Sequence, residues 1–195
     1  MPRIFTKALT SGVRHFRPLL FSASIVALLP CLFFPSALQA QKDKDPLTDN
    51  EADQIRELRD QPVQRIKLYQ KFIEDRLAAI KQIGPNPKAD DRKVALRAKM
   101  EEFTRLADEL QDNLDTFDDA HADIRKALKD LAPASAKWPE ILKQAAPDPA
   151  YDFSQETALN AAQSTADQTK QMLEHQQKYF AEHKDEANKN GMGPS

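Results

Sequence analysis

The chain has 195 residues, with 28 Lys and Arg, 30 Asp and Glu, and a single cysteine. This near-neutral balance argues against a general nucleic-acid binder, because binding to phosphate backbones needs a basic face. The lone cysteine, Cys31, excludes an intrachain disulfide and a metal site built from several cysteines.

The first forty residues have the order of a secretory signal peptide. A basic start precedes an uncharged stretch at 18–41, which contains an apolar run at 19–34 and ends in small residues before Gln41. This order predicts cleavage near Gln41 and a periplasmic or extracellular mature protein. A retained membrane anchor is the alternative, since the stretch is long enough to cross a bilayer, but Pro30 and Pro35 interrupt it.

Removal of residues 1–40 takes away four basic residues and no acidic ones, so the mature chain has 24 Lys and Arg against 30 Asp and Glu. No glycine occurs between positions 85 and 190. Hairpin turns and bulges in sheets need glycine, so this scarcity favours an all-α fold. The predicted organisation is a signal peptide at 1–40, a disordered leader at 41–47, a helical bundle domain at 48–188 and a disordered tail at 189–195.

The first helix is expected to begin after Thr48, because Thr48 and Glu51 have the spacing of a capping box. Pro62 then starts a second helix, which ends at Gly84 and the prolines after it. The apolar residues of this second helix share one face. They are Val63, Ile66, Ile73, Leu77 and Ile80.

The longest predicted helix runs from Asp90 or Asp91 to about residue 131. Its apolar positions alternate at spacings of four and three, as in coiled coils, provided that His121 is counted among them. The other positions are Leu96, Met100, Phe103, Ala107, Leu110, Leu114, Phe117, Ile124, Leu128 and Leu131. Such a rod needs other helices to cover its apolar stripe.

Pro139 is expected to open a short helix at 139–146, with Trp138 packed at the corner before it. After a stop at 146–149, a last helix with a weaker seam of small residues extends to about residue 188. The predicted fold is all-α: an elongated antiparallel bundle of three long helices with coiled-coil-like packing and a short fourth helix.

His121 and Asp118 are weak candidates for a metal site. His121 occupies a position in an apolar stripe, and histidine binds metals and changes charge near neutral pH. The alternative is a histidine at the edge of the bundle, with Asp118 or Arg125 as its partner. His175 and His183 lie eight residues apart, rather than three or four, and are interpreted as surface residues.

An acidic stretch lies between Arg105 and Arg125, where seven acidic residues occur with no basic one. The stripe within it consists of Asp108, Asp112, Asp115 and Asp119. We expect this stripe to be a solvated face, or to pair with basic residues of the second predicted helix. These are Arg65, Lys67, Lys71 and Arg76. A divalent cation or a basic partner is the functional alternative.

Catalytic motifs are missing from the sequence. It has no glycine-rich phosphate loop, no Gly-x-Ser-x-Gly turn and no His-Glu-x-x-His pair. The sequence therefore predicts no catalytic residue, no cofactor and no enzymatic activity.

Leu47-Thr48-x-x-Glu51 resembles the Leu-Thr-x-x-Gln motif of the small helical periplasmic chaperones. Here the motif occurs once, and Glu51 stands in place of the glutamine. The resemblance implies an exported helical protein that cradles unfolded chains.

The leading hypothesis is an exported, non-enzymatic helical protein that acts through its surface as an envelope interaction or scaffold module. The alternatives are a periplasmic chaperone-like holdase and a metal-binding helical protein that uses His121. The expected partner is another protein or a second copy of the chain. Nucleic acid is not expected, and membrane contact is expected only through an uncleaved signal segment.

Overall fold

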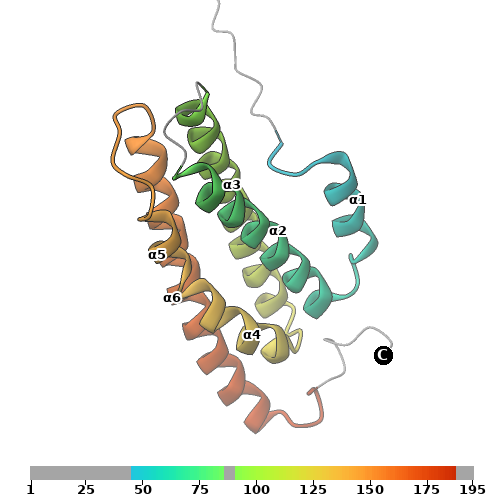
Figure 1. Ribbon diagram of the computed structural model, residues 1–195. Helices are drawn as coiled ribbons and strands as arrows, with labels where there is room; N and C mark the ends of the chain where they lie inside the picture. The colour runs from blue at the N-terminus through green and yellow to red at the C-terminus, as the bar shows by residue number, and fades with distance from the viewer. Residues whose placement is uncertain (1–44, 86–90, 188–195) are drawn as a thin grey trace, which may run out of the picture. The chain divides into compact units, whose positions relative to one another are not determined.

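The computed structural model describes residues 45–85 and 91–187 (Figure 1), which all lie in the unit Gln41–Ser195. These residues form six α-helices and no strand, so the predicted all-α class is confirmed. None of the described helices has the length and apolar character needed to cross a bilayer. The predicted signal peptide and the predicted tail lie outside the described residues.

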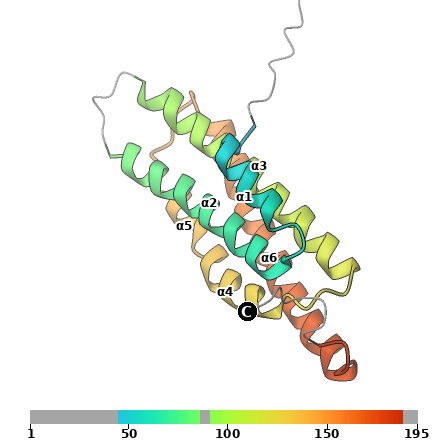
Figure 2. The same ribbon diagram turned by 90° about the vertical axis from the view of Figure 1, so that its right-hand side faces the viewer.

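The helices of this unit make four passes around one core. They are α1 (Asp49–Glu57), α2 (Pro62–Ile83), α3 (Arg92–Asp119), α4 (Arg125–Ser135), α5 (Trp138–Leu142) and α6 (Asp152–Glu182). The chain runs along α2, back along α3, returns through α4 and α5, and runs back along α6 (Figures 1 and 2). Because α2 packs on α3, α3 on α6, and both α4 and α5 on α2 and α6, α3 lies diagonally across the core from the α4–α5 pass.

The start of the fold follows the predicted capping chemistry. The Thr48 hydroxyl accepts a hydrogen bond from the Glu51 amide at 3.3 Å, and the Glu51 carboxylate accepts one from the Thr48 amide at 2.8 Å. Pro62 lies in the first turn of α2, and Gly84 caps its end. Pro46 is buried and Leu47 packs on the core, so the end of the predicted leader, at 45–47, belongs to the fold.

The core contains the apolar residues that the periodicity selected. All ten apolar positions of the long stripe are buried, as are the five of the second predicted helix. Trp138 is 1% exposed and meets Phe103 edge to face, with ring centroids 5.9 Å apart. Each buried Leu or Phe contributes roughly 1.5–3 kcal/mol relative to an exposed one, so this core is the main source of stability.

The predicted continuous helix to residue 131 is wrong, because α3 ends at Asp119. The Ala122 amide donates to the Phe117 carbonyl and the His121 amide to the Asp118 carbonyl, both at 2.9 Å, and His121 has a φ of 51°. This pattern is a Schellman motif, which usually places glycine at the left-handed position. The apolar spacing continues across the turn into α4. Because the turn ends α3, α4 is a separate helix and begins the third pass through the bundle.

The last predicted helices also differ in their ends. The short helix spans Trp138–Leu142 instead of 139–146, and α6 ends at Glu182 instead of about 188. The buried face of α6 is rich in small side chains, which lets the neighbouring helices approach closely. It comprises Ser154, Gln155, Ala158, Ala161, Ala162, Thr165, Thr169, Met172, Gln176 and Phe180.

Candidate functional site

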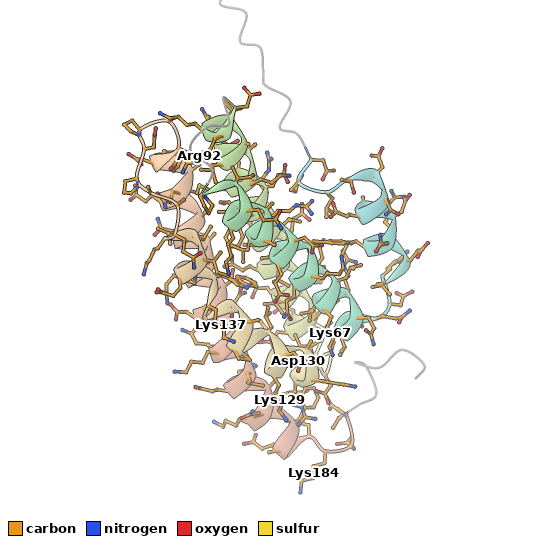
Figure 3. The ribbon with its side chains drawn as sticks, in the orientation of Figure 1. Lys67, Arg92, Lys129, Asp130, Lys137 and Lys184 are labelled. Atoms are coloured by element: carbon orange, nitrogen blue, oxygen red, sulfur yellow. The ribbon has the colours of Figure 1, made fainter. Side chains whose placement is uncertain are left out.

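Charge is unevenly distributed over the four passes of the bundle. Helix α2 carries five basic and two acidic residues, and so does the neighbouring segment 125–143 of the α4–α5 pass. The second half of α3, 106–119, carries six acidic residues and no basic one, and α6 carries five acidic and two basic residues. Figure 3 shows Lys129 and Lys137 on the α4–α5 pass, and Lys67 beside Asp130 where this pass meets α2.

A groove lies between the two basic passes. It has a volume of about 310 Å³ and is lined by Glu74, Leu77, Ala78 and Lys81 of α2 and by Ala134, Lys137, Trp138 and Ile141 of the α4–α5 pass. We call it the α2–α5 groove. Both sets of residues have the same spacing of three, one and three, which places each set on one side of its pass.

The α2–α5 groove is open because the residues above its apolar floor are small. Leu77 and Trp138 are 2% and 1% exposed and form an apolar floor, whereas Ala78 and Ala134 lack the side-chain volume to fill the space above it. A second hollow of about 150 Å³ shares Lys81 and Ile141 with the groove and extends it towards Gly84 and Ala145. The two hollows together follow α2 from residue 74 to its C-cap at Gly84.

The rim of the α2–α5 groove carries positive charge that its surroundings do not neutralise. Lys81 and Lys137 are exposed, and neither side-chain ammonium group forms an ion pair or a hydrogen bond with any residue that the structure describes. Glu74, the one acidic residue of the lining, accepts a hydrogen bond from Gln70 at 2.9 Å. The groove therefore offers an apolar floor between two free ammonium groups.

Trp138 has an unsatisfied polar atom at this site. Its indole Nε1 is buried and has no hydrogen-bond partner within residues 45–85 and 91–187. Buried indole N–H groups usually find an acceptor. Its position beside an open groove distinguishes it from the satisfied polar groups of the core.

A different kind of polar cluster lies on the other side of α2. The Arg76 side chain, 10% exposed, donates to the Glu51 carboxylate at 2.7 Å, to Glu102 at 3.2 Å and to the Pro46 carbonyl at 2.8 Å. The hydrogen bond from Arg76 is the main reason why the pKa of Glu51 falls to about 2. The glutamate of the chaperone-like motif is thus used in a helix cap and an ion pair.

One interpretation of the sequence expected the basic residues of α2 to pair with the acidic stripe of α3. Among the described residues no such ion pair forms. Arg76 pairs with Glu51 and Glu102, Lys67 with Asp130, and Lys71 with Asp75. The four stripe residues are exposed, which agrees with the solvated-face reading. One of them, Asp115, accepts a hydrogen bond from Gln168 of α6 at 2.6 Å.

The weak metal candidates His121 and Asp118 have separate partners. His121 is exposed at the turn rather than seated in the apolar stripe, and its ring stacks on Tyr179 at 4.7 Å. Asp118 lies 3.2 Å from His175 Nδ1 and accepts from Gln176 at 3.0 Å. Within the described ranges, no group of three or more His, Cys, Asp or Glu residues is arranged to hold a metal ion.

Comparisons with protein-family models, curated proteins and solved structures find no match for this chain.

Proposed function

We propose that the protein is an exported, non-enzymatic interaction module that binds an acidic segment of a partner protein in the α2–α5 groove. The observation that carries this proposal is the combination of an apolar floor at Leu77 and Trp138 with the unpaired Lys81 and Lys137 at the rim. Apolar side chains of the partner would fill the hollow, and acidic side chains beside them would pair with the two lysines.

The length of the groove suits a helical segment. Residues 74–83 of α2, together with the capping Gly84, span about 15 Å at about 1.5 Å per residue, which corresponds to roughly three helical turns. Amphipathic helices insert anchors at positions i, i+3, i+4 and i+7 into grooves of this kind. We therefore favour a partner helix with two or three apolar anchors and acidic flanks.

A membrane surface fits the groove less well than a protein segment. Helices that lie on membranes project large apolar side chains into the lipid. The large hydrophobic side chains exposed in the described part of the chain are Val94 and Phe153, which belong to α3 and α6. The floor of the groove is instead recessed, as needed to receive a side chain from a partner.

The proposal has two further parts, which are export of the protein and rigid packing of its long helices. The signal peptide predicted at 1–40 would deliver the bundle to the periplasm or the extracellular space. We also infer that α2, α3 and α6 pack in the coiled-coil-like manner that their heptad spacing predicts, which would keep the walls of the groove in place.

The proposal is tested with a fluorescently labelled helical peptide that has leucines at i and i+4 and glutamates on both flanks. We expect saturable binding by fluorescence anisotropy, weakening with salt, and at least about a tenfold loss of affinity in Lys81→Glu/Lys137→Glu because two attractive charges become repulsive. The matched control is Lys170→Glu/Lys178→Glu, which makes the same charge change on exposed positions of α6. Equal losses in both double variants would contradict a specific groove.

A second variant tests the hollow itself without changing charge. Ala78→Phe places a ring in the open space, whereas Ala98→Phe makes the same change on an exposed position of α3. We expect Ala78→Phe to abolish peptide binding and Ala98→Phe to preserve it. Suppression of client aggregation that is equal in both variants and indifferent to peptide charge would favour the chaperone-like holdase instead.

A further inference from the structure

A third hollow lies on the opposite side of the bundle, between α3 and α6. It has a volume of about 290 Å³, and its walls include Arg97, Glu101 and Arg105 of α3 and Phe153 of α6. None of these residues belongs to the α2–α5 groove, which is bounded by the other two passes. Any ligand of this hollow is therefore independent of the proposed partner segment.

Arg105 is the unusual charge of this hollow. Its Nε is shielded from solvent without a hydrogen-bond partner, and no acidic side chain of the described residues forms an ion pair with it. The acidic residue of the lining, Glu101, already pairs with Arg97 at 2.7 Å and accepts from Ser154 at 3.2 Å. A partly buried guanidinium without a counter-charge is unfavourable, so an anion that enters the hollow gains a strong partner.

Phe153 supplies an apolar wall beside this charge. Its side chain is 81% exposed, although large aromatic side chains are normally covered by the fold. The ring lies at the start of α6, where it lines the hollow together with Arg105. An exposed ring next to an unpaired arginine suits a ligand that joins an aromatic ring to an anionic group.

Two threonine hydroxyls limit which ligand groups can form hydrogen bonds with the walls of this hollow. Thr104 donates to the Met100 carbonyl at 3.0 Å, and Thr157 donates to the Phe153 carbonyl at 2.8 Å. Their hydrogens are thus used within their own helices, and only oxygen lone pairs remain for a ligand. The walls of the hollow therefore favour a ligand that also carries an N–H or O–H donor.

We propose that the α3–α6 hollow binds a small aromatic carboxylate, with the carboxylate on Arg105, the ring against Phe153 and a donor near Thr104 and Thr157. The volume lies at the lower end of small-molecule sites, which run from roughly 300 to 1,000 Å³. It accommodates one aromatic acid. The same chemistry occurs in a free aromatic acid and in the aromatic C-terminal residue of a peptide.

The test is calorimetric titration of the purified protein with N-acetylphenylalanine, N-acetylphenylalaninamide and the peptide acetyl-Ala-Ala-Ala-Phe with a free carboxylate. We expect saturable binding of N-acetylphenylalanine and at least tenfold weaker binding of the amide, which lacks the charge for Arg105. Binding of the peptide at least as tight as that of the single residue identifies a C-terminus as the source. Binding of the single residue alone identifies a free acid.

Two variants assign the site. Arg105→Gln and Phe153→Ala are each expected to weaken N-acetylphenylalanine at least tenfold, whereas Arg59→Gln and Val94→Ala, at exposed positions outside the hollow, leave it unchanged. Ala78→Phe should also leave it unchanged, which separates this site from the α2–α5 groove. The proposal is overturned if the unaltered protein shows no saturable heat, or if folded Arg105→Gln, verified by circular dichroism, binds as well as the unaltered protein.

Discussion

Helix α2 lies between two regions that differ in how their charged side chains are paired. On one side, Arg76 is bound to Glu51, Glu102 and the Pro46 carbonyl, so its buried charge is paired within the chain. On the other side, the next residue, Leu77, forms the floor of a groove where Lys81 and Lys137 have no partner in the described part of the chain. A network completed by the chain itself stabilises the fold, whereas the two solvated ammonium groups beside the open hollow are available to the partner segment proposed above.

The largest expected loss of stability follows from breaking the ion-pair network of Arg76. Arg76→Met leaves Glu51 and Glu102, whose side chains are 12% and 16% exposed, without their shared cation. Removal of one partner from a buried ion pair costs about 3–5 kcal/mol. Urea unfolding monitored by circular dichroism measures this loss. Lys71→Met, which breaks an exposed pair with Asp75, is the control and should cost less than about 1 kcal/mol; equal small losses would show that the network does not hold the fold.

The pH dependence of stability tests the interaction between Arg76 and Glu51 in a second way. The ordinary pKa of 4.5 falls to about 2 for folded Glu51, chiefly through the hydrogen bond from Arg76. Because the folded value is depressed, its contribution is fully present above about pH 4.5 and is lost as the pH falls through about 2, a total of roughly 3 kcal/mol. Unfolding free energies at pH 7, 4, 3 and 2 should fall less steeply for Glu51→Gln than for Glu57→Gln, an exposed control with the same charge change. Parallel curves would contradict this assignment.

Much of the structure around the Arg76 network was predictable from the sequence. The capping box at Thr48 and Glu51 and the start of α2 at Pro62 follow from local backbone chemistry, which short motifs record. The partnership between Arg76 and Glu102 was not predictable, because it joins residues of different helices and depends on their packing. Periodicity identifies the face that is buried but not the residues that meet there.

The turn at His121 shows a second limit of periodicity. The buried Ile124, Leu128 and Leu131 keep the spacing of the stripe in α3, although they belong to another helix. No glycine marks the break, because His121 takes the left-handed position itself. The signal that was available is Asp123, which accepts from the Arg125 amide at 3.3 Å near the start of α4. Without this turn, α4 would not return to α2 and the groove would not exist.

Substitutions at His121 therefore test how the α4–α5 pass is brought beside α2. His121→Ala and His121→Gly both remove the ring that stacks on Tyr179, so their difference isolates the cost of the left-handed backbone. We expect the glycine variant to be more stable than the alanine variant by about 1 kcal/mol, because glycine has no Cβ to clash. Thermal unfolding of the two variants measures this difference, and equal stabilities would contradict the Schellman assignment.

A smaller effect is expected from Glu109, a carboxylate at the contact between α2 and α3 whose burial is poorly compensated. Burial raises the pKa of Glu109 even though the Tyr69 hydroxyl donates to it at 3.2 Å. A raised folded pKa means that stability is lost as the pH rises through it, so the charged form is unfavourable at neutral pH. Glu109→Gln keeps an acceptor for Tyr69 and should raise the free energy of unfolding at pH 7, because it removes a partly buried charge. The gain should vanish at pH 4 and below, and a loss at pH 7 would contradict the assignment.

The groove itself could not be predicted, because its walls are about sixty residues apart in the sequence and come together only through the fold. Each wall taken alone is an ordinary amphipathic pattern with an alanine and a lysine. The α3–α6 hollow has the same origin, since Arg105 and Phe153 belong to different helices.

Trp138 provides the most direct test of the α2–α5 groove, because it is the single tryptophan of the chain and lies on the groove floor. Titration of the unlabelled acidic helical peptide should change the intrinsic tryptophan emission saturably, at the same concentrations that saturate anisotropy, and Ala78→Phe should remove the change. Peptide binding that leaves the Trp138 emission unaltered, or an emission change that persists in Ala78→Phe, would contradict the proposal that this groove receives the partner.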